Sequence, residues 1–107
     1  MTEFEGLLKV AFADHGSIDG LRAQLRAIRE LAEADIADTE RRFGEYAETG
    51  GPFPERLPVI ALAAEQFRLR SEALLRWVEW AEDATRDWTG VTIDDGASVP
   101  PDAFGRS

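Results

Sequence analysis

The chain has 107 residues, enough for one domain, and it is 44% hydrophobic and 31% charged, which excludes a disordered polymer. Its formal net charge of −9 argues against direct contact with nucleic acid or with an anionic membrane surface, and the absence of cysteine excludes disulfides and thiolate metal sites. The apolar runs are too short to span a bilayer and no signal peptide precedes them, so we expect a cytoplasmic chain.

Two helices are predicted in the first half of the chain. Residues 3–13 place their apolar side chains on one face and form a short helix that ends at Asp14-His15-Gly16. Ser17 is the expected N-cap of a longer helix over residues 18–48. The buried stripe of that second helix is predicted to be Leu21, Leu25, Ile28, Ala32, Ile36, Phe43 and Tyr46.

A third helix is predicted over residues 54–88, after the turn signal Thr49-Gly50-Gly51-Pro52. Its apolar residues recur at steps of three and four, which is the seam of a coiled coil. About 35 residues of helix extend roughly 50 Å, beyond the globule that a chain of this size forms, so this helix needs a partner. The seam residues that we assign to a dimer interface are Leu57, Ile60, Ala64, Phe67, Leu74, Val78, Ala81 and Trp88.

The predicted fold is therefore all-α. One short and two long helices form an antiparallel helical hairpin, which packs as a dimeric helical bundle because the hairpin alone buries too little surface. A second apolar stripe on the third helix, Leu62, Leu69, Trp77 and Trp80, would be buried by the same homodimer. Residues 1–88 form the helical domain and residues 89–107, with their Gly and Pro, form a flexible tail.

No catalytic site is predicted. His15 is the single histidine and is interpreted as a residue of a helix-ending turn, without a nucleophile constellation around it. Asp94 and Asp95 lack the alternating oxygen ligands of a calcium loop, and no Glu-x-x-His motif of a bundle metal site occurs. We expect neither an enzyme nor a bound metal or cofactor.

Three tryptophans fall close together near the end of the third helix, and two interpretations stay open for them. Trp77, Trp80 and Trp88 either pack in the core and the dimer interface, or they wall a pocket for a flat small molecule. The residues predicted to line such a ligand pocket are Trp77, Trp80, Phe67 and Phe12, with Arg76 available to meet a carboxylate.

Two runs carry a resemblance to a known family: LKVAFADHG at residues 8–16 and LRWVEWAE at residues 75–82. With this order of helices, the chain resembles the C-terminal effector and dimerisation domain of PadR-type transcriptional regulators, over about residues 3–88. The resemblance implies a homodimer, an aromatic effector bordered by Trp77 and Trp80, and no direct contact with DNA.

The winged-helix domain that precedes this module in the family has no counterpart here, so the resemblance implies one of two situations. The chain is the C-terminal half of a longer regulator, or it is a separate module that pairs with a full-length PadR-like regulator. The alternative function, outside transcription, is a protein that sequesters an aromatic small molecule.

Overall fold

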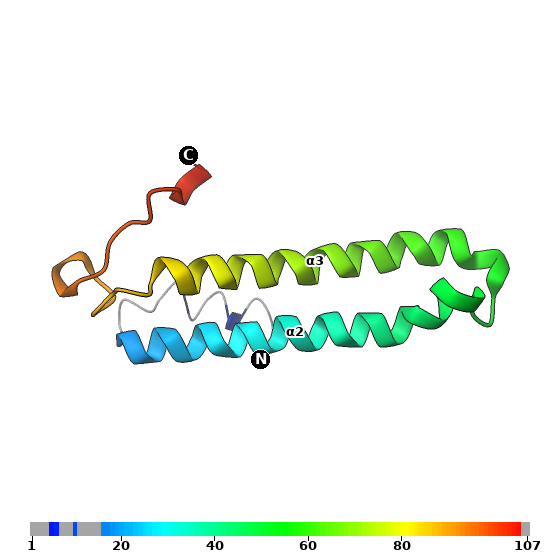
Figure 1. The fold of residues 1–107 in the computed structure, drawn as a ribbon, viewed down its shortest axis with the longest axis horizontal. Helices are drawn as coiled ribbons and strands as arrows, with labels where there is room; N and C mark the ends of the chain where they lie inside the picture. The colour runs from blue at the N-terminus through cyan, green and yellow to red at the C-terminus, as the bar shows by residue number, and fades with distance from the viewer. Residues whose placement is uncertain (1–4, 7–9, 11–15, 106–107) are drawn as a thin grey trace.

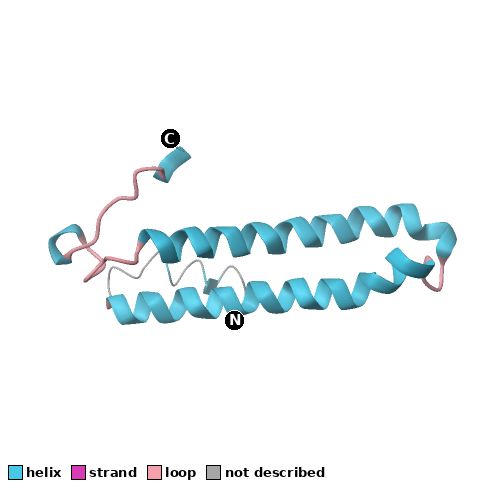
Figure 2. Cartoon of the chain, viewed as in Figure 1, coloured by secondary structure: helices cyan, strands magenta, loops and turns pink. Residues whose placement is uncertain are grey.

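The computed structural model describes residues 5–6, 10 and 16–105. Within these ranges the chain is helical and contains no strand, which confirms the all-α class. The long helices are α2 (Ile18–Thr49) and α3 (Leu57–Ala84), and the short 3₁₀ turns are η2 (Pro54–Arg56), η3 (Ile93–Asp95) and η4 (Ala103–Gly105) (Figure 2). The predicted short helix over residues 3–13 lies outside the described residues except at positions 5, 6 and 10, as do Phe12 and His15.

Helix α2 begins and ends close to the predicted residues. The Ser17 hydroxyl oxygen accepts a hydrogen bond from the Gly20 amide at 3.0 Å, which confirms Ser17 as the N-cap. At the other end Gly50 takes the left-handed conformation, with φ 80°, and its amide donates to the Tyr46 carbonyl. A residue with a side chain adopts this backbone conformation at a cost, so the glycine fixes where the helix stops and the turn begins.

Helix α3 is 28 residues long and is therefore shorter than the predicted 54–88. One 3₁₀ turn, η2, precedes α3. Pro58 lies in the first turn of α3, where a backbone N–H has no partner within the helix, so the proline loses no hydrogen bond. The helix ends at Ala84, and Arg22 of α2 donates hydrogen bonds to carbonyl groups of the residues that follow. Its Nη2 donates to the carbonyl oxygens of Trp88 at 2.9 Å, Arg86 at 3.3 Å and Thr85 at 3.5 Å.

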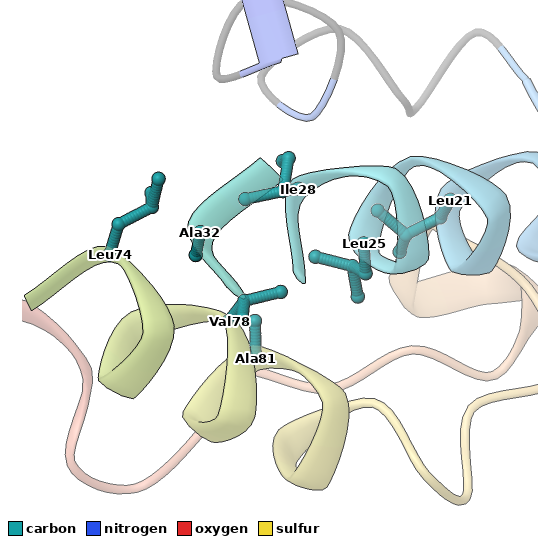
Figure 3. Packing of buried hydrophobic residues seen from close by; sticks show 7 residues of the cluster. All are labelled: Leu21, Leu25, Ile28, Ala32, Leu74, Val78 and Ala81. Carbon is teal, nitrogen blue, oxygen red and sulfur yellow. The ribbon is translucent and has the colours of Figure 1, made fainter. Parts of the chain in front are cut away.

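Helices α2 and α3 lie side by side and antiparallel, joined by the turn after Gly50 (Figure 1). Their apolar faces meet in a single cluster of buried residues, shown in Figure 3. Its members come from the first half of α2 and the second half of α3: Leu21, Leu25, Ile28, Ala32, Leu74, Val78 and Ala81. Ile28, Ala32 and Val78 are fully buried. The core therefore occupies one end of the hairpin, the end away from the turn.

The other half of the hairpin, next to the turn, has an incomplete core. Of the predicted α2 stripe, Ile36, Phe43 and Tyr46 are only half-buried, and Phe43 stacks on Phe67 of α3 with ring centroids 6.2 Å apart. Phe67 itself remains 45% exposed. Two helices alone cannot enclose side chains on every side, so this end presents apolar surface to its surroundings.

The molecule is accordingly long and thin, with principal extents of 59 × 29 × 18 Å. Its radius of gyration is 17.9 Å, against about 13 Å for a compact chain of this length. Its accessible surface is 7666 Å², against about 6,000 Å² for a compact monomer of its mass. The chain as a whole thus exposes roughly 1,700 Å² more surface than a compact fold of its mass would.

The segment after α3 has a defined course and contacts the helix. Thr89 Oγ1 donates to the Asp95 carbonyl at 2.8 Å, and Thr92 Oγ1 donates to the Asp95 carboxylate at 2.9 Å, which closes a small loop around η3. Farther along, the Trp80 indole N–H donates to Asp102 Oδ2 at 2.9 Å. The tail therefore returns to the outer face of α3.

Candidate functional site

Charged side chains hold α2 and α3 together beside the core. Arg29 of α2 donates to Glu82 of α3 from Nε at 3.0 Å and from Nη2 at 2.5 Å. Glu79 and Glu33 lie within 4 Å of the same guanidinium. The hydrogen bond to Glu82 and the charge of that carboxylate raise the pKa of Arg29 above its ordinary value. This cluster is structural.

The predicted dimer-interface residues divide into two groups. The first group is buried against α2 of the same chain: Leu74, Val78 and Ala81. Packing within one chain therefore explains why apolar residues recur at these positions of α3. A charge at Leu74 would therefore disrupt folding before it disrupted any dimer. Trp88 lies beyond the end of α3 and is half-buried against the same core.

The remaining predicted interface residues lie at the turn end and are not enclosed by the chain. Leu57, Ile60 and Ala64 line an open groove, and Phe67 lies on a different face beside Phe43. Assignment of these residues to a dimer stays a prediction.

An exposed apolar stripe runs along the side of α3 that faces away from α2. We define this outer stripe by four residues with exposed side chains: Val59 (65%), Leu62 (75%), Leu69 (53%) and Trp80 (38%). Gln66, Ala73 and Arg76 fall between them at the same steps of three and four. Of the second stripe predicted from the sequence, Leu62, Leu69 and Trp80 are on this surface and Trp77 is not. The tail meets this surface at Trp80 through Asp102. The other three stripe residues are exposed, and a seam of this period is suited to a second helix.

The three tryptophans come together at the core end of the hairpin. Trp77, Trp80 and Trp88 line one pocket of about 330 Å³, here called the Trp pocket, with Val91 and Pro100 of the tail in its wall. The Trp88 Nε1 atom is buried and has no hydrogen-bond partner among the described residues. Trp77 and Trp80 thus line the same pocket, and its use as a ligand site stays a prediction.

The other residues predicted for a ligand pocket are not part of the Trp pocket. Phe67 lies two to three helical turns away and contacts Phe43, and the Arg70 guanidinium lies 6.0 Å from its ring centroid. Arg76 is exposed and does not line the pocket. Phe12 lies outside the described residues. The structure therefore joins two of the five predicted residues and adds Trp88.

A second cavity, here called the tip groove, opens between the helices at the turn end. It measures about 370 Å³ and lies between the last third of α2 and the first half of α3. Its floor is apolar and its rim is charged. The floor comprises Ile36, Phe43, Gly44, Ala47, Leu57, Ile60, Ala61 and Ala64, and the rim comprises Glu40, Glu65, Arg68 and Glu72. The sequence analysis did not predict this groove.

Neither metal ligation nor membrane insertion finds a basis in the described part of the chain. Its residues contain no group of three or more His, Cys, Asp or Glu side chains arranged to hold a metal ion. None of its helices is long and apolar enough to cross a membrane.

Comparison with known proteins places this helical hairpin among transcription-regulation-like domains. Residues 5–86 match the family model described as virulence activator alpha C-term, and because this span covers most of the chain, the chain belongs to that family. No match was found in a search of curated proteins or in a search of solved structures.

This result corrects the family assignment made from the sequence. The matched family is that of the C-terminal part of virulence activator alpha, and the PadR-type C-terminal domain suggested by residues 8–16 and 75–82 is not the family found. The assignment went wrong because most of the residues that carried it are apolar and charged positions of amphipathic helices, which many helical families share. The PadR-specific function is withdrawn with it.

Proposed function

We propose that the chain is a homodimerisation module of a transcription-regulatory protein, and that the outer stripe of α3 is its self-association surface. The observation that carries the proposal is the exposure of Leu62 and Leu69, 75% and 53%, in a seam of helical period. Isolated exposed apolar residues are common, but a periodic row along one helix marks an interaction surface.

The amount of exposed surface supports a second copy of the chain as the partner. A stable interface buries about 800 Å² on each partner, and the whole chain exposes roughly 1,700 Å² more than a compact monomer of its mass. A second copy of α3 laid along the outer stripe would remove surface of this order. Family membership supports a regulatory role, since activators commonly position paired subunits on DNA.

Charge and size favour an antiparallel arrangement of the two α3 helices. In a parallel pair each Arg76 would face its own copy, which brings two positive charges together. In an antiparallel pair about a twofold axis, Arg76 faces Gln66 and Leu69 faces Ala73, so large side chains meet small ones. Leu62 then faces Trp80 of the other chain.

The oligomeric state and its dependence on the stripe test the proposal. Light scattering behind a sizing column is expected to give about twice the chain mass of 11.9 kDa. Leu69→Glu is expected to weaken association by about a hundredfold or more, because it buries a carboxylate without a partner. Ile93→Glu is the matched control, since Ile93 is 76% exposed and lies outside the stripe.

Single cysteines test the orientation, because the chain has none of its own. An oxidised mixture of Leu69→Cys and Ala73→Cys chains is expected to form the mixed disulfide in preference to either symmetric one. A monomeric wild-type chain at millimolar concentration, or an unchanged dimer in Leu69→Glu, would refute the proposal.

A second candidate function is ligand binding in the Trp pocket. The buried, unpartnered Nε1–H of Trp88 supports it, because such a donor is satisfied by a bound acceptor. A flat neutral amide such as benzamide is expected to quench the tryptophan emission saturably. Trp88→Phe keeps an aromatic ring and removes the donor, so it is expected to weaken binding by about fivefold. Quenching that rises linearly without saturation would contradict this candidate.

A further inference from the structure

The tip groove is separate from the proposed dimer surface. Its α3 residues, such as Ala61, Ala64 and Arg68, lie on a different face of the helix from Leu62 and Leu69, because each residue advances about 100° around the axis. A second copy of the chain docked on the outer stripe would therefore leave the floor of the groove open, with Glu65 of the rim next to the contact. The groove is also formed entirely by residues 36–72, at the end of the hairpin away from the Trp pocket.

Gly44 leaves open space in the lining of the groove. Glycine within a helix is less favourable than alanine by about 1 kcal/mol, yet Gly44 lies inside α2 (Ile18–Thr49) and in the groove lining. A Cβ atom built on it meets nothing within 4 Å. No packing contact in the described chain requires a glycine here, and the space it leaves belongs to the groove.

The charge of the rim indicates which kind of ligand the groove would favour. Arg68 donates to Glu72 at 2.8 and 2.9 Å and also to Glu65, so its charge is already neutralised by two carboxylates. The hydrogen bonds to Glu65 and Glu72 raise the pKa of Arg68 above its ordinary value. Glu40, on the α2 side of the rim, has no ion-pair partner among the described residues. Three carboxylates against one guanidinium leave an excess negative charge over an apolar floor.

We propose that the tip groove binds an amphipathic organic cation, with an apolar group on the floor beside Gly44 and a protonated amine at the rim facing Glu40. A volume of about 370 Å³ is within the range of small-molecule sites. The apolar floor supplies the affinity, and the excess carboxylate charge selects an ammonium group over a neutral or anionic group of the same shape.

Three probes of one shape test the charge preference: 4-phenylbutylamine, 4-phenylbutanol and 4-phenylbutyrate. Titration calorimetry on the full chain is expected to rank the amine first, the alcohol about threefold weaker and the carboxylate weakest. Glu40→Gln is expected to reduce the affinity for the amine to that for the alcohol and to leave the alcohol unchanged. Equal affinity for the amine and the carboxylate would overturn the proposal.

Substitutions that fill the groove test whether the amine binds there. Gly44→Leu places a side chain in the empty space and is expected to abolish binding of both the amine and the alcohol, while the circular dichroism spectrum stays helical. Ala23→Leu adds a side chain of the same size at an exposed position of α2 outside the groove and is expected to bind like the wild type. Ala61→Leu fills the groove from α3 and serves if Gly44→Leu does not fold.

Two further outcomes count against the proposal. Undiminished binding of the amine to both groove-filling variants would place its site elsewhere, with the Trp pocket as the next site to test. The second outcome concerns the protein without any probe. If the nuclear magnetic resonance shifts of groove residues then change with protein concentration, a second copy of the chain covers the groove. The Leu69→Glu variant, monomeric if the outer stripe forms the dimer, is expected to bind the amine normally.

Discussion

The location of the core at one end of the hairpin predicts unequal costs for the same substitution at two isoleucines. Ile28 of α2 is fully buried in the core, whereas Ile60 of α3 lines the open tip groove and is half-buried. Both lie inside helices, so the change in helix propensity on replacement by alanine is the same and cancels in the comparison. The difference between the two variants therefore reports packing alone.

The magnitudes follow from burial. Ile28→Ala loses about 0.8 kcal/mol for each buried methylene equivalent and leaves a closed cavity, which together amount to about 3–4 kcal/mol. Ile60→Ala opens onto a groove that water already reaches, so no cavity is closed off and about 1 kcal/mol is lost. A chain of this length has a total stability of about 5–15 kcal/mol, so the first variant loses a large share of it.

Urea denaturation followed by circular dichroism measures both variants, at one protein concentration so that any effect of association is held constant. Thermal unfolding is expected to show a decrease of roughly 15 °C for Ile28→Ala and of about 5 °C for Ile60→Ala. Equal losses for the two variants would refute the inference that the turn end lacks an enclosed core. A larger loss at Ile60 would mean that this groove is covered in solution.

Three further substitutions test individual contacts. Gly50→Ala is expected to cost about 1 kcal/mol or more in urea denaturation, because its φ of 80° disfavours a side chain, and a neutral effect would contradict the assigned turn. Glu82→Gln is expected to lower the urea midpoint at low salt, with a smaller difference at high salt, because the charge of Arg29 loses its nearest partner; a salt-independent effect would mean that packing dominates. Asp102→Ala removes the acceptor of the Trp80 indole and is expected to speed proteolytic cleavage of residues 91–105, whereas an unchanged cleavage rate would show that this hydrogen bond does not hold the tail.

Most of the helical framework was predicted from local patterns. Ser17 before an apolar repeat predicted the N-cap, and the pair Gly50-Gly51 predicted the turn, because both signals act through the backbone within a few residues. The α2 stripe was also predicted, since its period of 3.6 places Leu21 to Ala32 on one face. The end of α3 was not, and the carbonyl groups just beyond it accept hydrogen bonds from Arg22, more than 60 residues away along the chain, which no local pattern reports.

The candidate sites could not be predicted from the sequence pattern alone. A heptad period reports that Leu74 and Ile60 share an apolar face, but it does not report whether α2 or another molecule covers each of them. The role of Gly44 could not be predicted from the sequence, because the groove beside it exists only once α3 is packed against α2. The return of Asp102 to Trp80 was equally invisible, since a single side-chain hydrogen bond leaves no periodic signal.

Because the core is confined to one end of the hairpin, the two halves of each long helix are expected to differ in the free energy of local unfolding. Amide hydrogens near Ile28 and Val78 exchange only when the packed end opens, so their protection is expected to approach that of global unfolding. Amides near Phe43 and Ile60 are expected to exchange through a smaller, separate opening of the turn end. The hairpin then behaves as a fixed base with a movable tip, and anything bound at the tip would slow exchange there while the base stays unchanged.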